Sequence, residues 1–576
     1  MHGSSLEMGK QTKKVILFGP ATADTEAQEL TAGELNALLD DQNRVKTIVA
    51  VPGSLNQVPV LVMHGPKRSQ RLRADYMQAD LAVEGWVRTV EAQGNLQGSS
   101  DEGEIQAENG VVEMWPKVNE AHLVTVRGNV RVDAHDAKSG LSRKLRTNAL
   151  QMTFEGGAPN QRSELKHGET LDRGTVEWTD AAGADSKLTA DKLTVDFGAA
   201  GKAQHVVASG NVDTVRVLPG KPTQTATAAN GDVLLDEAGQ WTQMNLHDNV
   251  HLKEGDRSAE SQQAVFVQAS QTAVLTGRAV ARDESSETRA TKITFHQDSG
   301  DIEAEGRVRS TDLGEKKASI QLSPVPANIT AQHMTGNAKT GHALYTGHAR
   351  MWQGPSVMEA NSIELFRQNQ ELRALGDVRA VFPQQSNDNS APGSKGTTAV
   401  SGGAALKATR DNSAAKPVAA GATTTKNDPN TADKQPVNWH INCEKLTYWD
   451  NENRAHLEGN VVAQSADQRM RGPVLELYFI RSADGTPNSQ GTAQISRAVG
   501  TGGVMVEEGD RRGTAERAVY TADDDKFVLS GGTPTLYDAT EGTTTGRELT
   551  FNLADDTIVV DSETGKRTLT KHRVQR

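Results

Sequence analysis

Two histidines, His247 and His251, lie four residues apart, and an acidic residue, Asp248, follows the first of them. Imidazole and carboxylate groups bind zinc when a helix presents such a pair on one face. The flanking residues instead alternate between apolar and polar types, which is typical of a strand. We therefore expect both histidines on an exposed strand face or turn, and the sequence predicts no metal site and no cofactor.

The other motifs that could support catalysis are also weak. The run Asp523–Asp525 lies where similar segments have polar turns, and it lacks the ligand spacing of a calcium loop. Gly500, Gly502 and Gly503 do not form a GxGxxG motif, and neither a P-loop nor a GxSxG motif occurs. The 74 Asp and Glu residues make chance carboxylate pairs inevitable, so no pair stands out as general acid and base. The sequence predicts that the protein is not an enzyme.

Tryptophan and cysteine, which often mark binding sites, give no cluster. The seven Trp residues occur one at a time, and the closest pair is Trp439 and Trp449. A sugar-binding platform would need several together, so packing within repeats is the better interpretation. The single cysteine, Cys443, excludes a disulfide bond within the chain. It occupies a place where similar segments have Ala190 or Ala360, so we expect a small buried core residue.

The elements that must position these residues are short hairpins. In the stretch from Met358 to Val381, Ile363 and Leu365 alternate with polar residues, a polar turn follows, and a second run is apolar at every other position. Such period-2 alternation predicts strands with one buried face. The same unit recurs in residues 188–212, 289–308, 442–463 and 545–560.

The units close on a position in the apolar phase of the strand, which is a glycine in all of the following signals except one, where it is Asp248. The closing signal recurs at Gly94-Asn95-Leu96, Gly128-Asn129-Val130, Gly210-Asn211-Val212, Asp248-Asn249-Val250, Gly277-Arg278-Ala279, Gly306-Arg307-Val308, Gly347-His348-Ala349, Gly376-Asp377-Val378, Gly459-Asn460-Val461 and Gly531-Gly532-Thr533. Several steps, such as 248 to 277 and 277 to 306, are 29 residues long. Repeats of this period indicate a solenoid-like or stacked architecture. We infer that a missing side chain lets the strand bend sharply or lets another group approach closely.

Composition limits the function classes. Of the 576 residues, 36% are hydrophobic and 4% aromatic, and 53 are glycine, which suits many short strands around a thin core. The net charge of −12 argues against a nucleic-acid binder and against electrostatic adhesion to anionic membranes. No run approaches the roughly 20 apolar residues that span a bilayer. The apolar run in 13–18 is too short for a signal-peptide core, so either the protein is cytoplasmic or the chain lacks its native targeting segment.

The repeat pattern divides the chain into three segments. Residues 1–383 hold repeats, which are degenerate in 1–100, and residues 438–576 resume the pattern. Between them, residues 384–437 are rich in Ser, Thr, Ala, Asn, Gly and Pro without an apolar period, which predicts a disordered linker or loop. We favour a loop within one continuous series of repeats over a border between two domains. The segment Glu26–Leu39 fits either a helix or a strand, and we favour a strand because the repeat register continues through it.

The stretches 329–381 and 440–463 resemble the OstA-like repeat (organic solvent tolerance protein). That repeat occurs in periplasmic lipopolysaccharide transport proteins, namely the bridging LptA and LptC type and the N-terminal domain of LptD. The shared features are an opener Ala-x-x-Ile/Leu-x-Leu/Tyr/Phe, a polar turn, a closer Ala/Leu-x-Gly-Asn/Asp/His-Val/Ala, and the spacing between them. The resemblance is good across 188–383 and 438–563 and fainter before residue 100.

The resemblance implies an all-β fold, a long repetitive β-jellyroll of stacked antiparallel hairpins. This jellyroll would be open along one side and would have a lipid-lined interior. It implies a non-enzymatic carrier or bridge that shields the acyl chains of lipopolysaccharide, or of a related glycolipid, in an apolar groove during transport to the outer membrane. We expect inward apolar residues to contact these chains. The candidates are Leu193, Val195, Ile293, Phe295, Ile363, Leu365, Leu446, Tyr448, Leu475 and Leu477.

The resemblance also implies a periplasmic location and a set of partners. Other lipopolysaccharide transport components would join through unpaired edge strands, and copies of the chain would associate end to end in the same way. Nucleic acid is not expected as a partner. Two alternatives stay open: a closed β-solenoid that serves as a scaffold or adhesin without a groove, and a β-helix enzyme acting on polysaccharide. The enzyme would need carboxylates and aromatic residues clustered on one face of neighbouring units.

Overall fold

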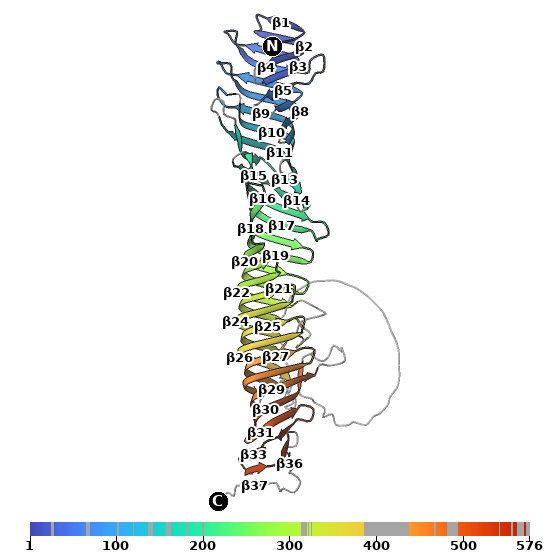
Figure 1. Cartoon of the computed structure of the whole chain (residues 1–576), viewed down its shortest axis with the longest axis vertical. Coiled ribbons are helices and arrows are strands. Elements are labelled where there is room, and N and C mark those ends of the chain that lie inside the picture. Colours follow the sequence, from blue (N-terminus) through green and yellow to red (C-terminus); the bar gives the residue numbers. More distant parts are fainter. Residues whose placement is uncertain are drawn as a thin grey trace, which may run out of the picture. The chain divides into compact units, whose positions relative to one another are not determined.

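A computed structural model of the chain shows its fold (Figure 1). The structure describes residues 1–24, 28–64, 69–100, 103–118, 120–135, 142–156, 163–179, 183–198, 201–312, 320, 322–323, 325–384, 437–465, 468–480, 493–540, 542–553, 557–561 and 569–571. These residues form 37 β-strands and no α-helix. None of them therefore belongs to a helix that could span a membrane.

Most strands run without a break. They are β1 (Ser5–Gly9), β2 (Lys14–Asp24), β3 (Gln28–Leu39), β8 (Val87–Ser100), β9 (Gly103–Met114), β10 (Ala121–His135), β11 (Ser142–Glu155), β16 (Ala203–Val217), β17 (Gln224–Leu235), β18 (Trp241–Glu254), β19 (Arg257–Val267), β20 (Thr272–Arg282), β21 (Ser286–His296), β22 (Asp301–Asp312), β23 (Asn328–Asn337), β24 (His342–Gln353), β25 (Ser356–Phe366), β26 (Glu371–Gln384), β27 (Val437–Trp449), β28 (Arg454–Gln464), β29 (Gln468–Ile480), β30 (Gln494–Glu508) and β31 (Arg511–Thr521).

The remaining strands are short and follow one another in pairs, so that two of them together replace one long strand. They are β4 (Val45–Val51), β5 (Val60–His64), β6 (Ser69–Arg73), β7 (Tyr76–Leu81), β12 (Glu164–Thr170), β13 (Gly174–Thr179), β14 (Asp185–Ala190), β15 (Lys192–Phe197), β32 (Lys526–Ser530), β33 (Thr535–Asp538), β34 (Gly542–Thr545), β35 (Glu548–Asn552), β36 (Thr557–Asp561) and β37 (Leu569–Lys571). Thus β12 and β13 both pair with β11, and β32 and β33 both pair with β31.

Long strands that follow one another in the chain pair antiparallel. The pairings β16–β17, β17–β18 and β18–β19 are one example, and β27–β28, β28–β29 and β29–β30 are another. The burial of side chains alternates along each strand, as in β20, where Ala273 and Leu275 are buried. The predicted all-β class, built from stacked antiparallel hairpins, is confirmed.

The closing signals mark corners, which lie within a strand except at Gly531 and Gly532, where the corner lies between β32 and β33. In β20, Gly277 and Arg278 have φ angles of 79° and 54°, and together they oppose one residue of β21, Thr291. Two residues opposite one form a β-bulge, which bends the strand and increases its twist. The next residue, Ala279, is fully buried. The prediction that glycine lets the strand bend is therefore confirmed, and the polar residue that follows it shares the positive φ.

Two further corners were not predicted from the sequence. Gly19 in β2 has a φ of 84°, and the register of β2 on β3 shifts directly after Phe18. Gly502 and Gly503 in β30 have φ angles of 84° and 89° at a register shift on β31. The glycines of β30 were considered only as a nucleotide-binding motif, although their positions match the closing signal of other strands.

The chain divides into two compact units, each with its own apolar interior. Unit 1 comprises Met1–Ile320, Pro326–Met351 and Asn361–Leu372, and unit 2 comprises Gln321–Val325, Trp352–Ala360 and Arg373–Arg576. The ambiguous segment Glu26–Leu39 is a strand, β3, from Gln28 onward, as favoured. Nearly all of the predicted linker 384–437 lies outside the described residues, so the three-segment division stays a prediction.

Candidate functional site

Within each unit, the corner divides every strand into two arms that line an interior. Because consecutive strands are antiparallel, their connections alternate between two edges. We call edge A the side of the β17–β18 connection in unit 1 and of the β27–β28 and β29–β30 connections in unit 2. Edge B is the side of β20–β21 in unit 1 and of β28–β29 and β30–β31 in unit 2. Arm A runs from edge A to the corner, and arm B from the corner to edge B.

All ten residues predicted to contact lipid lie on arm A of their strands. Seven are at most 2% exposed, namely Leu193, Ile293, Ile363, Leu446, Tyr448, Leu475 and Leu477. The other three, Val195, Phe295 and Leu365, are half-buried. The structure therefore places all ten on inward-facing positions, six in unit 1 and four in unit 2.

The four residues of unit 2 form two rows across neighbouring strands. Leu446 of β27 and Leu475 of β29 both pair with Leu457 of β28. Tyr448 and Leu477 likewise both pair with Ala455. Cross-strand neighbours on one face pack against each other, so these rows form a continuous apolar lining.

Arm B forms the opposite wall of the interior, and its residues were not among the predicted contacts. In unit 2 this wall includes Phe382, Trp439, Ile441 and Met470, and all four are buried. On the arm B side of the corner, these residues continue the alternation of inward and outward positions and point inward. Following the period-2 pattern through each closing signal would have identified them.

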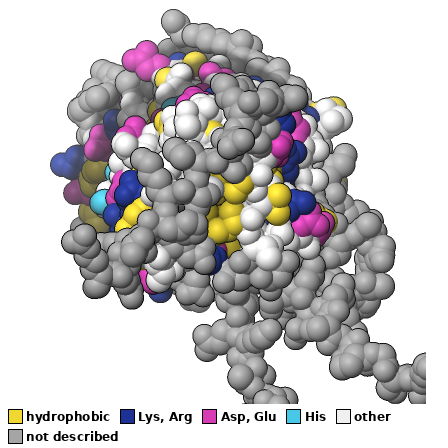
Figure 2. Space-filling view, turned by 90° about the horizontal axis from the view of Figure 1, so that it is seen from below, with side chains coloured by type: hydrophobic (Ala, Val, Ile, Leu, Met, Phe, Trp, Pro, Cys, Tyr) yellow, Lys and Arg dark blue, Asp and Glu magenta, His cyan; other side chains and the backbone are white. Residues whose placement is uncertain are grey.

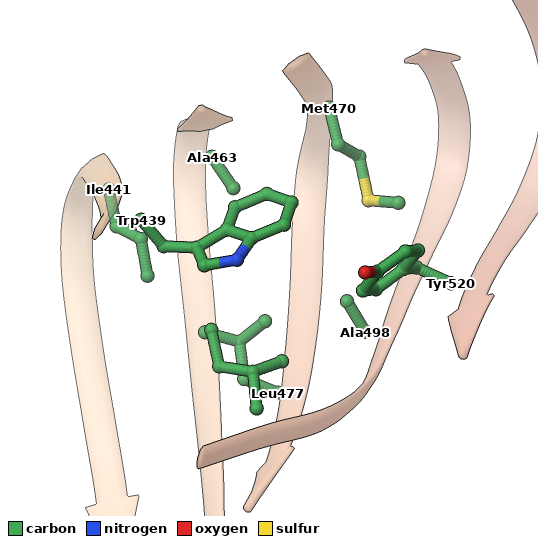
Figure 3. A pocket seen from close by; sticks show the side chains of 8 residues that line it. Trp439, Ile441, Ala463, Met470, Leu477, Ala498 and Tyr520 are labelled. Carbon is green, nitrogen blue, oxygen red and sulfur yellow. The ribbon is translucent and has the colours of Figure 1, made fainter. Parts of the chain in front are cut away.

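A small cavity lies between the two arms of unit 2 (Figure 3). Arm B contributes Trp439, Ile441, Ala463 and Met470, and arm A contributes Leu477, Ile495, Ala498 and Tyr520. The cavity leaves only about 10 Å³ for a water-sized group. Pockets for drug-sized ligands measure about 300–1,000 Å³, so a ligand of that size could enter only if the arms moved apart.

Aromatic pairs join the two arms of unit 2. The rings of Trp439 and Tyr520 have centroids 5.8 Å apart, and those of Phe382 and Phe479 lie 5.5 Å apart in an edge-to-face arrangement. Each pair takes one ring from arm B and one from arm A. Aromatic pairs at this spacing are attractive, so the arms are held together by contacts that a bound apolar chain would have to replace.

A second cavity, also with room for only about 10 Å³, has a charged group at its wall. Arg511, at edge B, donates through Nε to Asp538 Oδ2 at 2.8 Å. The guanidinium carbon of Arg511 also lies 5.6 Å from the ring centroid of Phe551. The apolar part of the wall includes Phe527, Leu529 and Leu536. Arg511 and Asp538 thus compensate each other's charge beside an apolar surface.

The outer face carries the residues that the sequence offered as metal ligands. His247 and His251 flank the corner of β18, where His247 Nε2 lies 3.5 Å from Asp232 and His251 Nδ1 lies 3.9 Å from Glu260. The run Asp523–Asp525 forms the turn between β31 and β32, as expected. No group of three or more potential ligands within the described residues is arranged to hold a metal ion.

Hydrophobic side chains are also visible on the surface seen from below. Figure 2 shows them gathered toward the middle of this face, with acidic and basic side chains around them. Large exposed apolar residues in the described part of the chain include Leu6 and Met8 of β1 and Val559 of β36. Both strands end a series of pairings, since β1 pairs with β2 and β36 with β35.

The single cysteine is a core residue, as predicted. Cys443 is free and buried on β27, and burial raises the pKa of its thiol to about 12. A thiol of this kind is protonated at neutral pH and is a poor nucleophile or metal ligand.

Comparison of the sequence with protein families assigns the chain. The profile of the family described as "LptA/(LptD N-terminal domain) LPS transport protein" matches residues 158–301, 328–478 and 440–557, which together exceed half of the chain. The chain belongs to this lipopolysaccharide (LPS) transport family. The predicted resemblance to OstA-like transport proteins is thereby confirmed.

One solved structure similar to this LPS transport family member is LptH from Pseudomonas aeruginosa. It is described as the LptA-homologous periplasmic component of the conserved lipopolysaccharide transport device of that organism. The two chains are 14% identical, the match covers 25% of this chain and 97% of LptH, and the TM-score is 0.20. No curated protein sequence matches the chain.

Proposed function

We propose that this LPS transport family member is a non-enzymatic periplasmic carrier or bridge. The acyl chains of lipopolysaccharide, or of a related glycolipid, would lie between the two arms, against the ten inward residues of arm A and the opposite wall of arm B. The observation that carries the proposal is an interior lined from both arms by apolar side chains without a charged group among the predicted contact residues. Each buried CH₂ group contributes about 0.8 kcal/mol, which offsets the separation of the arms.

The same lining recurs from strand to strand, which suits movement better than storage. A chain that moves from β27 past β28 to β29 follows one row, Leu446, Leu457 and Leu475, and meets a similar side chain at each strand. Net binding energy then changes little along the interior, because each new contact replaces a similar one. The net charge of −12 supports the expectation that nucleic acid is not a partner.

Partners of this carrier would bind at the strands that end a series of pairings. β1 and β36 present backbone groups and exposed apolar side chains, which is the surface that strand addition needs. Other transport components, or a second copy of the chain, would extend the sheet there. We further propose that 384–437 is a loop between two runs of the same repeats.

Photo-crosslinking at Ile363 tests the proposal. Ile363 is fully buried and faces inward, whereas its neighbour Glu364 faces outward and lies 2.7 Å from His342 Nε2. We expect a photoreactive residue at 363 to capture added lipopolysaccharide and one at 364 not to capture it. A second pair, Leu477 at the cavity wall and the out-of-phase Tyr478, repeats the comparison in unit 2.

The outcome separates the carrier from the scaffold alternative. Capture at 363 and 477 but not at 364 and 478 supports an inward lipid site. Absence of capture at both inward positions, in protein whose circular dichroism matches the unmodified chain, would support a scaffold with a permanently packed interior.

A further inference from the structure

A short segment bridges the two edges of unit 2. This segment, which we call the clasp, consists of Leu322, Ser323 and Val325, between β22 and β23 in the chain. The N–H of Leu322 donates to Gln353 Oε1 at 2.9 Å, and the carbonyl oxygen of Leu322 accepts from the N–H of Ala493 at 3.0 Å. One residue, Leu322, thus contacts the end of β24 through its N–H and the residue before β30 through its carbonyl oxygen.

These two contacts lie on opposite edges. Gln353 is the last residue of β24, at the β24–β25 turn, and Ala493 precedes β30 at the β29–β30 connection. Successive connections in a series of antiparallel strands alternate between the two edges. The β24–β25 and β29–β30 connections are an odd number of connections apart, so the first lies on edge B and the second on edge A. The clasp therefore crosses the gap between the arms, which is the lateral mouth of the interior.

Gln353 fixes the clasp with its whole amide group. Its Nε2 donates to the carbonyl oxygens of Ser323 at 2.8 Å and Val325 at 2.9 Å, while its Oε1 accepts from Leu322. The side chain is 1% exposed, so it exchanges no hydrogen bond with solvent when the clasp is closed. A buried amide that loses its partners is costly, which makes the closed arrangement specific.

The clasp covers the rim of the interior. Gln353 and Ser356 occupy the last inward positions before and after the β24–β25 turn, and both are buried. Their counterparts at the β30–β31 turn, Glu508 and Arg511, are half-buried. Contact with the turn is tight, since a Cβ added at Gly354 would lie 2.7 Å from Ser323 Oγ. Leu322 itself is buried, so the clasp adds an apolar side chain to the mouth.

Unit 1 has independent contacts of the same kind. Arg143, at the edge B end of β11, donates to the carbonyl oxygen of Gly239 in the β17–β18 turn on edge A at 2.8 Å. Arg367, in the β25–β26 turn on edge A, donates to Ser285 Oγ in the β20–β21 turn on edge B at 2.7 Å. Connections of opposite edges therefore meet in unit 1 as well, through a half-buried and an exposed arginine rather than through a buried amide.

We propose that the clasp is a gate for lipid in unit 2: it holds the lateral mouth closed through Gln353, and lipid enters between the arms only after Leu322 leaves Gln353 and Ala493. The inference rests on the proposed function, because it names how the same interior is opened. The occupant that displaces the clasp is the acyl part of lipopolysaccharide, whose apolar chains match the cavity that Trp439 and Leu477 line.

Amide exchange tests the closed clasp directly. Gln353→Leu removes three hydrogen bonds at similar side-chain size, and the Leu322 N–H should then exchange about 100-fold faster. Gln464→Leu is the matched control, because Gln464 is an exposed glutamine at the end of β28 on the same edge. An unchanged exchange rate in Gln353→Leu would overturn the clasp. Gly354→Ala is a second variant, which should loosen Ser323 without removing the amide.

Lipid capture tests the gate. In a Cys443→Ala chain, cysteines at Val325 and Gln494 can be joined by a reducible bismaleimide, since Val325 is exposed and Gln494 follows Ala493. A photoreactive residue at 477 then reports on added lipopolysaccharide. In the bridged protein, we expect the probe at 477 to capture no more lipopolysaccharide than a probe at 478 does. Reduction of the bridge should restore capture at 477, and Gln353→Leu should increase it.

The outcomes distinguish the gate from the proposed function. Equal capture in the bridged and reduced proteins overturns the gate and leaves the carrier intact. No capture in any variant, including the unbridged chain and Gln353→Leu, overturns the carrier and the gate together.

Discussion

The corner at Gly459 allows a quantitative test of how the strands bend. Gly459 has a φ of 80°, and a Cβ added there would lie 2.7 Å from the Cβ of Glu444 on β27. The neighbouring Asn460 donates to Glu444 Oε1 at 2.7 Å, so Glu444 cannot move away without losing this bond. Gly459→Ala should therefore suffer both a backbone penalty and a collision.

Gly503, at the corner of β30 in the same unit, separates these two effects. Its φ is 89°, and an added Cβ would meet no atom within 4 Å. Gly503→Ala should carry only the left-handed penalty of about 1–2 kcal/mol. Gly459→Ala should carry that penalty and about 1–3 kcal/mol more from overpacking. Since both substitutions change the unfolded chain alike, the difference between them isolates the collision.

Hydrogen exchange is the suitable assay, because repeat proteins open locally and a single unfolding free energy is poorly defined for them. Each variant is compared with the unmodified chain. The acceleration of amide exchange in β28 of Gly459→Ala should exceed that in β30 of Gly503→Ala by about 5- to 150-fold. Equal effects would refute the close approach to Glu444 as a reason for glycine. No effect in either variant would refute the need for glycine at the corner.

Three further predictions concern single side chains. Ser356 Oγ is buried without a hydrogen-bond partner, so Ser356→Ala should stabilise β25 by about 1 kcal/mol and slow its amide exchange about 5-fold. The exposed Ser99→Ala is the control, and faster exchange in Ser356→Ala would reveal a partner. Because the thiol of Cys443 has a pKa of about 12, it should react with iodoacetamide at pH 8 only after unfolding in urea, and rapid alkylation of the folded chain would contradict its burial. Burial raises the pKa of Asp283, but hydrogen bonds from Ser285 and Ser286 outweigh this effect and hold it below its ordinary value. Asp283 should then stabilise the fold at neutral pH and lose this effect as pH falls below about 4. The thermal midpoint of Asp283→Asn should therefore vary less between pH 7 and 3 than that of the unmodified chain. Parallel pH curves of the two midpoints would refute the coupling.

The sequence determined the local order of this protein. Alternation at Ile363 and Leu365 identified strands and their buried face, because the period of two is a property of the extended backbone itself. The glycine and polar pairs identified the corners, because few residues accept the positive φ that a bulge requires there. The family resemblance rested on the same local features, and the family comparison confirmed it.

Only the tertiary structure decided what faces what across the interior. Trp439 lies opposite Tyr520, and Leu322 lies between Gln353 and Ala493, although these residues are tens to more than a hundred positions apart in the chain. Such partners depend on the bend and twist of every strand between them, which accumulate and leave no periodic trace in the sequence. The clasp residues follow no repeat pattern, so their role became visible only from the two edges that they join.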